Sequence, residues 1–454
     1  MKNLDNIFAN SSGFSKSAIS VFRISGDKSL DILKQLTKNF KIESIKPKQV
    51  YLRSIYVPGT NYLIDNALII FFKSPNSFTG EDLLEIHVHG SIAIRKILTN
   101  TLSEMSGMRA ASPGEFTKRA FLNGKLDLTS VEGLSDLLEA ETEIQHQQAI
   151  IQNSGALAEL YNKWKERLVY IMSLIEANID FSEDIPNDLI KNIEQEIKKL
   201  TEEISQYIND NNRGEIIRNG IQLTIFGPPN VGKSSFTNYL IQREISIISN
   251  IPGTTRDLIE GHLNIGGFPI IIQDTAGINL NSTDIIEQKG IEITNNAVHK
   301  AKIKILILDI NDKTYDYLTL KPLVDKNTIL LLNKSDINNY NQDNAKFITN
   351  IIPLNPIIIS LKNNTSTENI LSKIIETAKH ITESHDTLPP ITRERHRNHI
   401  QNTLKYLSNF SAEDELVLIA ENVRLAINHF SKLTGQITVD DVLEKIFSNF
   451  CIGK

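Results

Sequence analysis

The sequence of 454 residues has a single cysteine, Cys451, close to its end, and a single tryptophan. One cysteine excludes an internal disulfide. The sequence also lacks any apolar run near the roughly 20 residues that a bilayer span requires. Residues 1–10 contain no basic stretch followed by an apolar one, which is the pattern of a signal peptide. We therefore expect a cytoplasmic protein without a membrane span.

The sequence has no excess of positive charge. Its formal net charge is -6 at pH 7, so nothing attracts nucleic acid to the chain as a whole, and an RNA contact would need a local basic patch. Hydrophobic residues make up 40% and charged residues 22%, a balance that is typical of globular proteins and excludes a disordered or fibrous chain. A chain of this length should form several domains, roughly three at about 150 residues each.

Short apolar runs alternate with polar loops and helical segments between residues 220 and 378. Such runs are typical of strands that are buried on both faces of a parallel sheet. They predict a doubly wound α/β domain over residues 219–378, with ligand loops at the carboxyl ends of its strands. The runs span residues 221–226, 268–273, 303–310, 327–332 and 357–360.

The segments on either side of this domain have helical patterns, with apolar residues at intervals of three and four between residues 160 and 175. We expect segments 119–218 and 379–454 to pack together as one all-α helical domain, because the ends of an inserted domain usually lie close together. Residues 1–118 predict an N-terminal α+β domain. Its strand-like stretches are residues 18–24, 66–72 and 83–88.

A glycine-rich loop, GPPNVGKS at residues 227–234, follows an apolar run and opens a helical segment. This is the context of a phosphate-binding loop, in which glycines let backbone N–H groups turn onto the phosphates. Lys233 would place its ammonium against the β and γ oxygens, and Ser234 would offer a hydroxyl to Mg²⁺. The predicted nucleotide contacts of this loop are Asn230, Val231, Gly232, Lys233, Ser234 and Ser235.

An Asp-x-x-Gly motif ends the second apolar run. Its carboxylate can hold a Mg²⁺-bound water, and its glycine N–H can sense the γ-phosphate. The loop GTTRD at residues 253–257 adds Thr255, whose hydroxyl would complete the Mg²⁺ shell, although a polar surface loop is the plain alternative. The residues of the Asp-x-x-Gly motif are Asp274, Thr275, Ala276 and Gly277.

The NKSD motif at residues 333–336 follows another apolar run and predicts the choice of base. Asp336 can accept two hydrogen bonds from the N1–H and the 2-amino group of guanine, whereas adenine offers no such pair. Leaving a carboxylate unpaired would cost on the order of 1–3 kcal/mol, so Asp336 selects GTP over ATP. Ser360 begins the last base-contacting loop, although Leu361 stands where GTPases usually have alanine. The predicted contacts are Asn333, Lys334, Asp336 and Ser360.

Two parts of a hydrolytic site are not supplied by these motifs. Ile278 takes the position at which Ras-type GTPases carry a glutamine that orients water, and its side chain has no polar atom. A positive charge for the transition state is also needed, and Arg256 is one option for an arginine finger.

Several strings outside the α/β domain carry a specific resemblance. They are DNIFA at residues 5–9, FRISG at 22–26, PNSFTGED at 75–82, PGEFTKRAFLNGK at 113–125 and CIGK at 451–454. On these strings and the nucleotide motifs, the whole chain resembles the tRNA-modification GTPases of the MnmE, or TrmE, family. The resemblance implies a P-loop GTPase domain inserted between the helical segments.

The family is similar to the potassium-activated GTPases, which implies that K⁺ replaces an arginine finger. Glu287, in a Glu-x-x-Gly string like that of the family, would orient the attacking water, whereas position alone favours a solvated carboxylate at a helix start. The implied K⁺ ligands are Asn230, Ser249, Ile251 and Thr254. Of these, Ser249 and Thr254 would also contact GTP.

Family members bind a folate one-carbon donor, 5-formyl- or 5,10-methylene-tetrahydrofolate, in the N-terminal domain. They form homodimers, pair with the flavoprotein MnmG in a heterotetramer, and install a carboxymethylaminomethyl-type group at C5 of the wobble uridine of certain tRNAs. The residues that match the folate site are Arg23, Glu85, Lys125 and Lys454. Cys451 is either catalytic in the transfer or a small buried residue. Residues 11–18 lack the glycine-rich loop that is usual in the family before the Arg-x-Ser-Gly motif, which leaves the loop geometry near Arg23 open.

The alternative function is an RNA-binding GTPase switch in ribosome assembly, without chemistry on RNA. Such a switch would need neither the N-terminal domain nor the terminal CIGK string. A basic run with Arg393, Arg395 and Arg397, together with His396 and His399, could touch tRNA, but a solvated helix face is the favoured interpretation.

Overall fold

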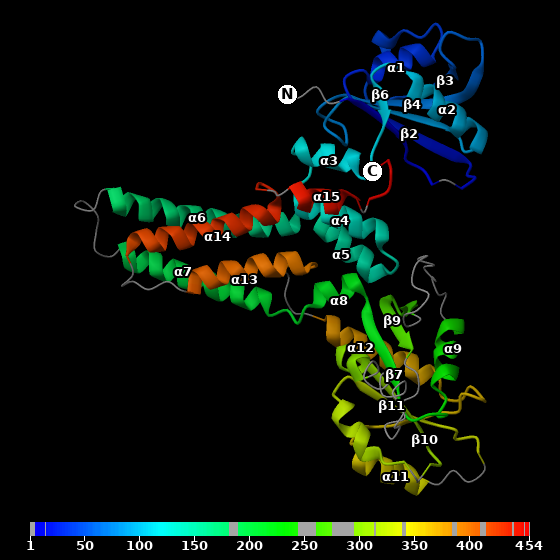
Figure 1. The fold of residues 1–454 in the computed structure, drawn as a ribbon, viewed down its shortest axis with the longest axis vertical. Coiled ribbons are helices and arrows are strands. Elements are labelled where there is room, and N and C mark those ends of the chain that lie inside the picture. Colours follow the sequence, from blue (N-terminus) through cyan, green and yellow to red (C-terminus); the bar gives the residue numbers. More distant parts are fainter. Residues whose placement is uncertain are drawn as a thin grey trace. The chain divides into compact units, whose positions relative to one another are not determined.

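The computed structural model describes residues 5–13, 15–180, 189–243, 260–274, 295–312, 315–337, 342–383, 388–408, 415–437, 440–448 and 450–453. The chain divides into two compact units. The first consists of Met1–Ser135, Gln152–Glu176 and Val423–Lys454, and the second of Asp136–Ile151 and Ala177–Asn422. Figure 1 shows the elements of both.

The first unit contains a mixed sheet of the order β3-β4-β5-β2-β1-β6. Neighbouring strands are antiparallel except β1 and β6, which are parallel. The predicted strand-like stretches are confirmed as β2, β4 and β5. The elements are β1 (Asn6–Asn10), β2 (Ile19–Ser25), α1 (Ser29–Leu36), η1 (Ile42–Ser44), β3 (Val50–Tyr56), β4 (Leu63–Phe72), β5 (Leu83–His89), α2 (Ile92–Glu104) and β6 (Met108–Ala110).

One face of this sheet is covered by α1 and α2. Apolar side chains of these helices, such as Leu33 and Leu98, pack with Phe22 and Ile86 of the strands in one buried cluster. Along β4, exposed and buried positions alternate, as expected for a strand that is covered on only one face. Leu68 lies on the other face and is exposed.

Helices follow the sheet in the chain. Within the first unit, Trp164 is fully buried and its ring lies 5.9 Å from that of Phe430, so segments far apart in the sequence share one core. In the second unit α7 packs against α13. Helices from before and after the α/β region therefore pack against each other within each unit, and their union in one helical domain stays a prediction. The helices are α3 (Glu115–Leu122), α4 (Leu128–Glu139), α5 (Glu143–Asn153), α6 (Ala156–Asp180), α7 (Leu189–Ile208), α8 (Arg213–Asn219), α13 (Glu394–Ser408), α14 (Leu416–Thr434) and α15 (Asp440–Ser448).

The α/β sheet of the second unit has the order β12-β11-β10-β7-β9-β8. Every neighbouring pair is parallel except β8 and β9. The sequence did not predict β8, because His262 and Asn264 interrupt its apolar residues, as an edge strand permits. The elements are β7 (Ile221–Phe226), α9 (Lys233–Arg243), β8 (Glu260–Ile265), β9 (Phe268–Asp274), β10 (Ile303–Asp309), η2 (Tyr317–Leu323), β11 (Thr328–Asn333), α11 (Gln342–Ile351), β12 (Ile357–Ile358) and α12 (Glu368–Thr382).

Helices cover both faces of this sheet. Ile305 of β10 belongs to a cluster with residues of α9 and α12, whereas its neighbour Leu306 belongs to a second cluster with residues of η2 and α11. Successive side chains of a strand point to opposite faces, so the strand is buried on both. This is the predicted doubly wound P-loop fold.

Among the residues that the structure describes, we find no helix whose length and hydropathy would let it cross a membrane.

Candidate functional site

The phosphate-binding loop runs from the end of β7 to the first residue of α9, and its backbone requires glycine at two positions. Gly227 has φ +144, and a Cβ there would lie 2.2 Å from the carbonyl oxygen of Ile307 on β10. Gly232 has φ +107, and a Cβ there would lie 2.5 Å from the side-chain nitrogen of Asn333. L-residues rarely adopt such backbone angles, so these two glycines fix the path of the loop.

Lys233, the first residue of α9, folds its side chain back over this loop. Its Nζ donates hydrogen bonds to the carbonyl oxygens of Gly227, at 3.0 Å, and Pro228, at 2.6 Å. Only 7% of Lys233 is exposed, whereas Ser234 and Ser235 are exposed in the first turn of α9. The ammonium is thus held at the helix N-terminus, where backbone N–H groups and the helix dipole favour an anion.

Asn333, at the end of β11, joins the phosphate loop to the loop after β12. Its Nδ2 donates to the carbonyl oxygen of Val231 at 2.8 Å, and its Oδ1 accepts from the N–H of Leu361 at 3.1 Å. The residue is 4% exposed. One buried amide therefore sets the spacing between the predicted phosphate and base contacts.

Asp336 and Ser360 meet beside this amide. The Ser360 hydroxyl donates to Asp336 Oδ1 at 2.7 Å. This hydrogen bond is the largest cause that lowers the pKa of the Asp336 carboxyl below its ordinary value, ahead of a backbone hydrogen bond of Asp336 itself and the positive charges of Lys362 and Lys334. The carboxylate therefore stays ionised at neutral pH and keeps acceptor capacity for a ligand.

Lys334 takes a left-handed backbone conformation, with φ +66, which a lysine adopts infrequently. Its Nζ lies 2.8 Å from Asp309 Oδ2, and its carbonyl oxygen accepts from Asn311 Nδ2 at 3.1 Å. These contacts from the end of β10 hold the predicted base-contacting loop in that strained form.

The other predicted residues of the nucleotide site are described only in part. Asn230 is exposed and has φ +60, at the tip of the phosphate loop. Asp274 is the last residue of β9, but its side chain is not among those described. The residues that lie outside the described part of the chain are Ser249, Ile251, Thr254, Thr255, Thr275, Ala276, Gly277 and Glu287.

A second group of predicted residues lies on the N-terminal sheet. Arg23 of β2 and Glu85 of β5 are direct cross-strand partners, and Arg23 Nε lies 2.9 Å from Glu85 Oε1. The second oxygen of Glu85 lies 3.2 Å from His87 Nε2, and the Arg23 guanidinium lies 5.6 Å from the centre of the Phe78 ring. An ion pair, an imidazole and an aromatic ring thus converge on the sheet face that α1 and α2 leave uncovered.

The loop that contains Phe78 also reaches Lys125, whose Nζ donates to the carbonyl oxygen of Pro75 at 3.1 Å. Among the described residues, Lys125 makes no hydrogen bond or ion pair with Arg23 or Glu85. Lys125 and Arg23, both predicted folate residues, therefore contact the same loop, at Pro75 and at Phe78 respectively.

The end of the chain lies against the same sheet. The carbonyl oxygen of Gly453 accepts from the Ser11 hydroxyl at 3.0 Å, and that of Cys451 accepts from the N–H of Gly114 at 3.5 Å. Ser11 follows directly on β1, whose Ala9 is the strand partner of Arg23. Cys451 is exposed, which contradicts its interpretation as a small buried residue. Lys454 lies outside the described residues.

Residues 11–18 lack the expected glycines, and serine hydroxyl groups fix the position of this segment. The Ser12 hydroxyl accepts from the N–H of Val21 at 2.7 Å, and Gly13 accepts at its carbonyl oxygen from Arg95 at 2.7 Å. Serine side chains therefore anchor this segment to β2, and its backbone is anchored to α2.

The basic run after α12 is not a solvated helix face, so that interpretation is wrong. Arg393 donates to Asp136 at 2.6 Å, and Arg397 donates to Asp210 at 2.8 Å. Their side chains are only 21% and 11% exposed, respectively. The two guanidinium groups hold the helical part together, which leaves little of their charge for RNA.

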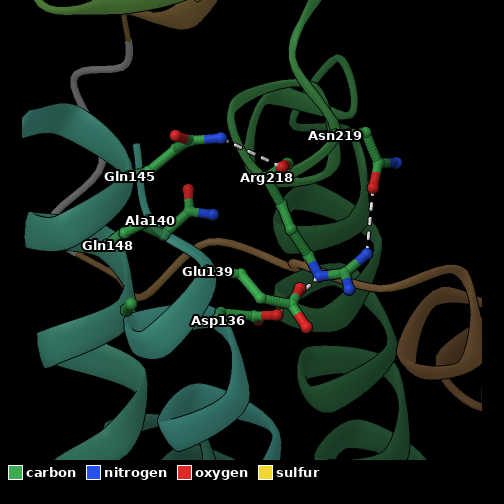
Figure 2. A pocket seen from close by; sticks show the side chains of 8 residues that line it. Asp136, Glu139, Ala140, Gln145, Gln148, Arg218 and Asn219 are labelled. Carbon is green, nitrogen blue, oxygen red and sulfur yellow. Dashed lines mark hydrogen bonds and ion pairs between the residues drawn. The ribbon is translucent and has the colours of Figure 1, made fainter. Parts of the chain in front are cut away.

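Asp136 also binds Arg218, at 2.8 Å, in a polar cavity of about 190 Å³ (Figure 2). Arg218 lies just before β7 and Arg393 lies after α12, so one carboxylate holds both chain segments that connect the α/β sheet to the helices. Sequence reasoning missed Asp136, because an isolated aspartate on a helix carries no local signal.

Two family models match the chain. One, described as the N-terminus of the GTP-binding protein TrmE, matches residues 6–125, and the other, described as the MnmE helical domain, matches residues 128–451.

Relatives match over nearly the whole length. The tRNA modification GTPase MnmE of Rickettsia prowazekii (strain Madrid E) is 49% identical over 454 residues, which cover 99% of this chain and 100% of that protein. The protein of the same name from Rickettsia bellii (strain OSU 85-389) is 49% identical over 456 residues, with the same coverage. Among solved structures, a variant of Era from Aquifex aeolicus bound to GDP and AlF4⁻ is 25% identical and matches 42% of this chain and 68% of that chain, with a TM-score of 0.30.

Proposed function

The chain belongs to the MnmE family of tRNA modification GTPases, and from this premise we propose that it hydrolyses GTP to drive the modification of C5 of the wobble uridine. In this proposal the group added is of the carboxymethylaminomethyl type, its carbon comes from a reduced folate, and the flavoprotein MnmG is the partner. The chain would act as a homodimer within that complex.

The observation that carries the proposal is the arrangement of Asn333, Asp336 and Ser360. Asn333 ties the phosphate loop to the base loop, and Ser360 fixes the carboxylate of Asp336 with one oxygen still able to accept. Guanine presents two neighbouring donors to such a carboxylate, and adenine does not. The site therefore fits GTP.

The chain has groups suited to the cations of GTP hydrolysis. The exposed hydroxyl of Ser234 fits Mg²⁺ at the start of α9, and Thr255 and Asp274 would complete its shell. The Asn230 amide oxygen at the tip of the phosphate loop is a chemically suitable K⁺ ligand, with Ser249, Ile251 and Thr254 as the others. Both cations would neutralise charge that develops on the phosphates. Glu287 would orient the attacking water in place of the glutamine that Ile278 replaces.

The N-terminal sheet offers a site of the right chemistry for a folate. A pterin presents amide-like donors and acceptors, which suit Glu85 and Arg23, and its ring can pack on Phe78. Lys125 and Lys454 would meet the anionic glutamyl tail. The docking of Gly453 on Ser11 supports this role for the end of the chain, because it brings the residue before Lys454 to the end of β1 and leaves Cys451 exposed.

The proposal is tested by mass spectrometry of wobble uridines in tRNA from cells that lack this protein. The modification should disappear, and it should return when the wild-type gene is supplied. Complementation by an Asp336→Asn variant should fail, because modification would depend on GTP. If the wobble uridine stays modified while ribosomal subunits accumulate as precursors, the chain is an RNA-binding GTPase switch of ribosome assembly instead.

A further inference from the structure

The edge of the N-terminal sheet holds a concentration of positive charge in a chain whose net charge is -6. Glu43 is the only acidic residue between positions 34 and 53. The cationic residues there are Lys34, Lys38, Lys41, Lys46, Lys48 and Arg53. Within the described part of the chain, none of these cations forms an ion pair with a carboxylate. This stretch is set apart by six cations against one carboxylate within 20 residues of sequence.

Aromatic rings lie among these cations. Lys38 Nζ lies 4.4 Å from the centre of the Tyr56 ring, and the Arg53 guanidinium lies 4.3 Å from Phe40 and 5.7 Å from Tyr51. A bridge between Thr37 and Ile55 holds this segment against β3, the edge strand. We call these residues the basic–aromatic surface: Lys38, Phe40, Lys41, Lys46, Lys48, Tyr51, Arg53 and Tyr56.

A hollow of about 420 Å³ opens beside this surface. Lys38 and Tyr56 line it together with Pro58 and Asn61. Its volume falls within the roughly 300–1,000 Å³ of small-molecule pockets, so it can hold an unpaired nucleotide. Lys38 and the Tyr56 ring lie at its wall, a cation suited to a phosphate and an aromatic side chain suited to a base.

We propose that the basic–aromatic surface binds an unpaired RNA loop, with the cations on phosphates and the rings against bases. The identification of that RNA as tRNA rests on the proposed function. Cations without a paired carboxylate repel one another, and the phosphates of a bound RNA would remove this unfavourable repulsion. Unpaired loops suit this surface better than a duplex, because only splayed bases can reach a ring.

A plainer role exists for lysines on an edge strand, since charge there prevents pairing with another sheet. That role requires only the charges. It explains neither the rings that lie beneath Lys38 and Arg53 nor the hollow next to them.

The experiment measures binding of the full-length chain to a fluorescent anticodon stem–loop over a series of salt concentrations. Lys41→Glu with Lys46→Glu changes two exposed side chains that support no core packing. We expect affinity to fall on the order of tenfold. The slope of log K against log salt should fall by about 1.4, because each of two phosphates that is no longer neutralised accounts for about 0.7. Tyr56→Leu should weaken binding by a similar factor without changing the slope, because it removes stacking and no charge.

The matched control is Lys191→Glu with Lys198→Glu on α7, which makes the same charge change at exposed positions. The control should bind as the wild type does, and every variant should keep normal GTP hydrolysis. Equal losses in the control and the surface variant, or equal binding of the stem–loop and a duplex, would overturn the proposal. Failure of the proposed function is seen separately, because the wobble uridine would then stay modified in cells that lack the protein.

Discussion

The two sheets of this chain differ in how their strands are covered. In the α/β sheet, β10 and β11 are buried along nearly their whole length, with helices on both faces. In the N-terminal sheet, β4 alternates between exposed and buried positions. The face opposite α1 and α2 is covered only in part, where Phe116 of α3 packs with Ile7 and Leu83. A site in the first sheet can form only at strand ends, whereas the second also offers a face and an edge.

This difference sets how each candidate site is built. The predicted nucleotide residues follow directly on strands of one sheet, so residues close in sequence lie in the same candidate site, as Asn333 and Asp336 do. The second site joins Arg23 to Glu85, 62 residues away, and Ser11 to Gly453, 442 residues away. Strand-end sites leave local motifs, and sites on sheet faces leave scattered residues.

The largest expected effect concerns the local site. Asp336→Asn keeps one acceptor oxygen for the guanine N1–H but sets an NH2 donor against the guanine 2-amino group, so a charged hydrogen bond worth about 1.5–3 kcal/mol is lost and a donor is left unpaired at a cost of about 1–3 kcal/mol. The kcat/KM for GTP should therefore fall about 10²- to 10⁴-fold. Xanthosine triphosphate, whose C2 oxygen accepts a hydrogen bond, should become the better substrate. Steady-state hydrolysis of both nucleotides checks this, and an unchanged kcat/KM for GTP would show that Asp336 does not read the base.

The next effect concerns the cation. If Asn230 helps to hold K⁺, hydrolysis should rise steeply with K⁺ but hardly with Na⁺ at matched ionic strength, and Asn230→Ala should lower kcat by about 10²-fold. Folate binding should not change in this variant. Equal rates in both salts, together with a large loss in Arg256→Ala, would indicate an arginine finger instead.

The fold of the α/β region was largely predictable, because strands buried on both faces are continuous apolar runs. The run at 221–226 matches β7, and the run at 303–310 matches β10 to within one residue. The strand β8 escaped prediction because an edge strand can carry polar residues such as His262 and Asn264.

Contacts between distant residues could not be predicted from spacing. Asp136 meets Arg218 and Arg393 across 82 and 257 residues, and nothing local marks it as their partner. The basic run that includes Arg397 was misinterpreted for the same reason, since its carboxylate partners precede it by 182 and 187 residues. Charge patterns identify ionised side chains but not the groups that neutralise them.

A further test concerns the backbone of the phosphate-binding loop at Gly227. Gly227→Ala places a Cβ 2.2 Å from the Ile307 carbonyl oxygen at a φ of +144, so we expect the free energy of unfolding to fall by about 3 kcal/mol, with loss of nucleotide binding. Gly261→Ala on β8 is the matched control, because a Cβ there meets nothing within 4 Å. Urea unfolding checks both, and equal stability of the two variants would contradict the tight contact between β7 and β10.

The smallest effect concerns Glu115, the first residue of α3, and the arginines that it contacts. Burial raises the pKa of Glu115, but hydrogen bonds from Arg109 and from the N–H of Ser112 lower it more, from 4.5 to about 2. The folded state therefore favours the ionised carboxylate, and this stabilisation is complete above about pH 4.5 and is lost as the pH falls through 2.

Glu115→Gln should consequently lower the free energy of unfolding by about 2 kcal/mol at pH 7, and the gap to the wild type should shrink by about half at pH 3. Urea unfolding of both proteins at the two pH values measures this gap. A gap that stays constant with pH would mean that the Arg109 and Arg119 contacts do not depend on the charge of Glu115.

In the proposed function GTP turnover and tRNA chemistry use separate parts of the chain, and deletion of residues 451–454 should separate the two activities. The described residues of this tail contact Gly114 and Ser11 and none of the nucleotide residues. GTP affinity and K⁺-stimulated hydrolysis should therefore stay near normal, while wobble-uridine modification falls to background. Cys451→Ser and Lys454→Ala, made singly, would divide the loss between the thiol and the charge. Normal modification by the truncated protein would contradict the claim.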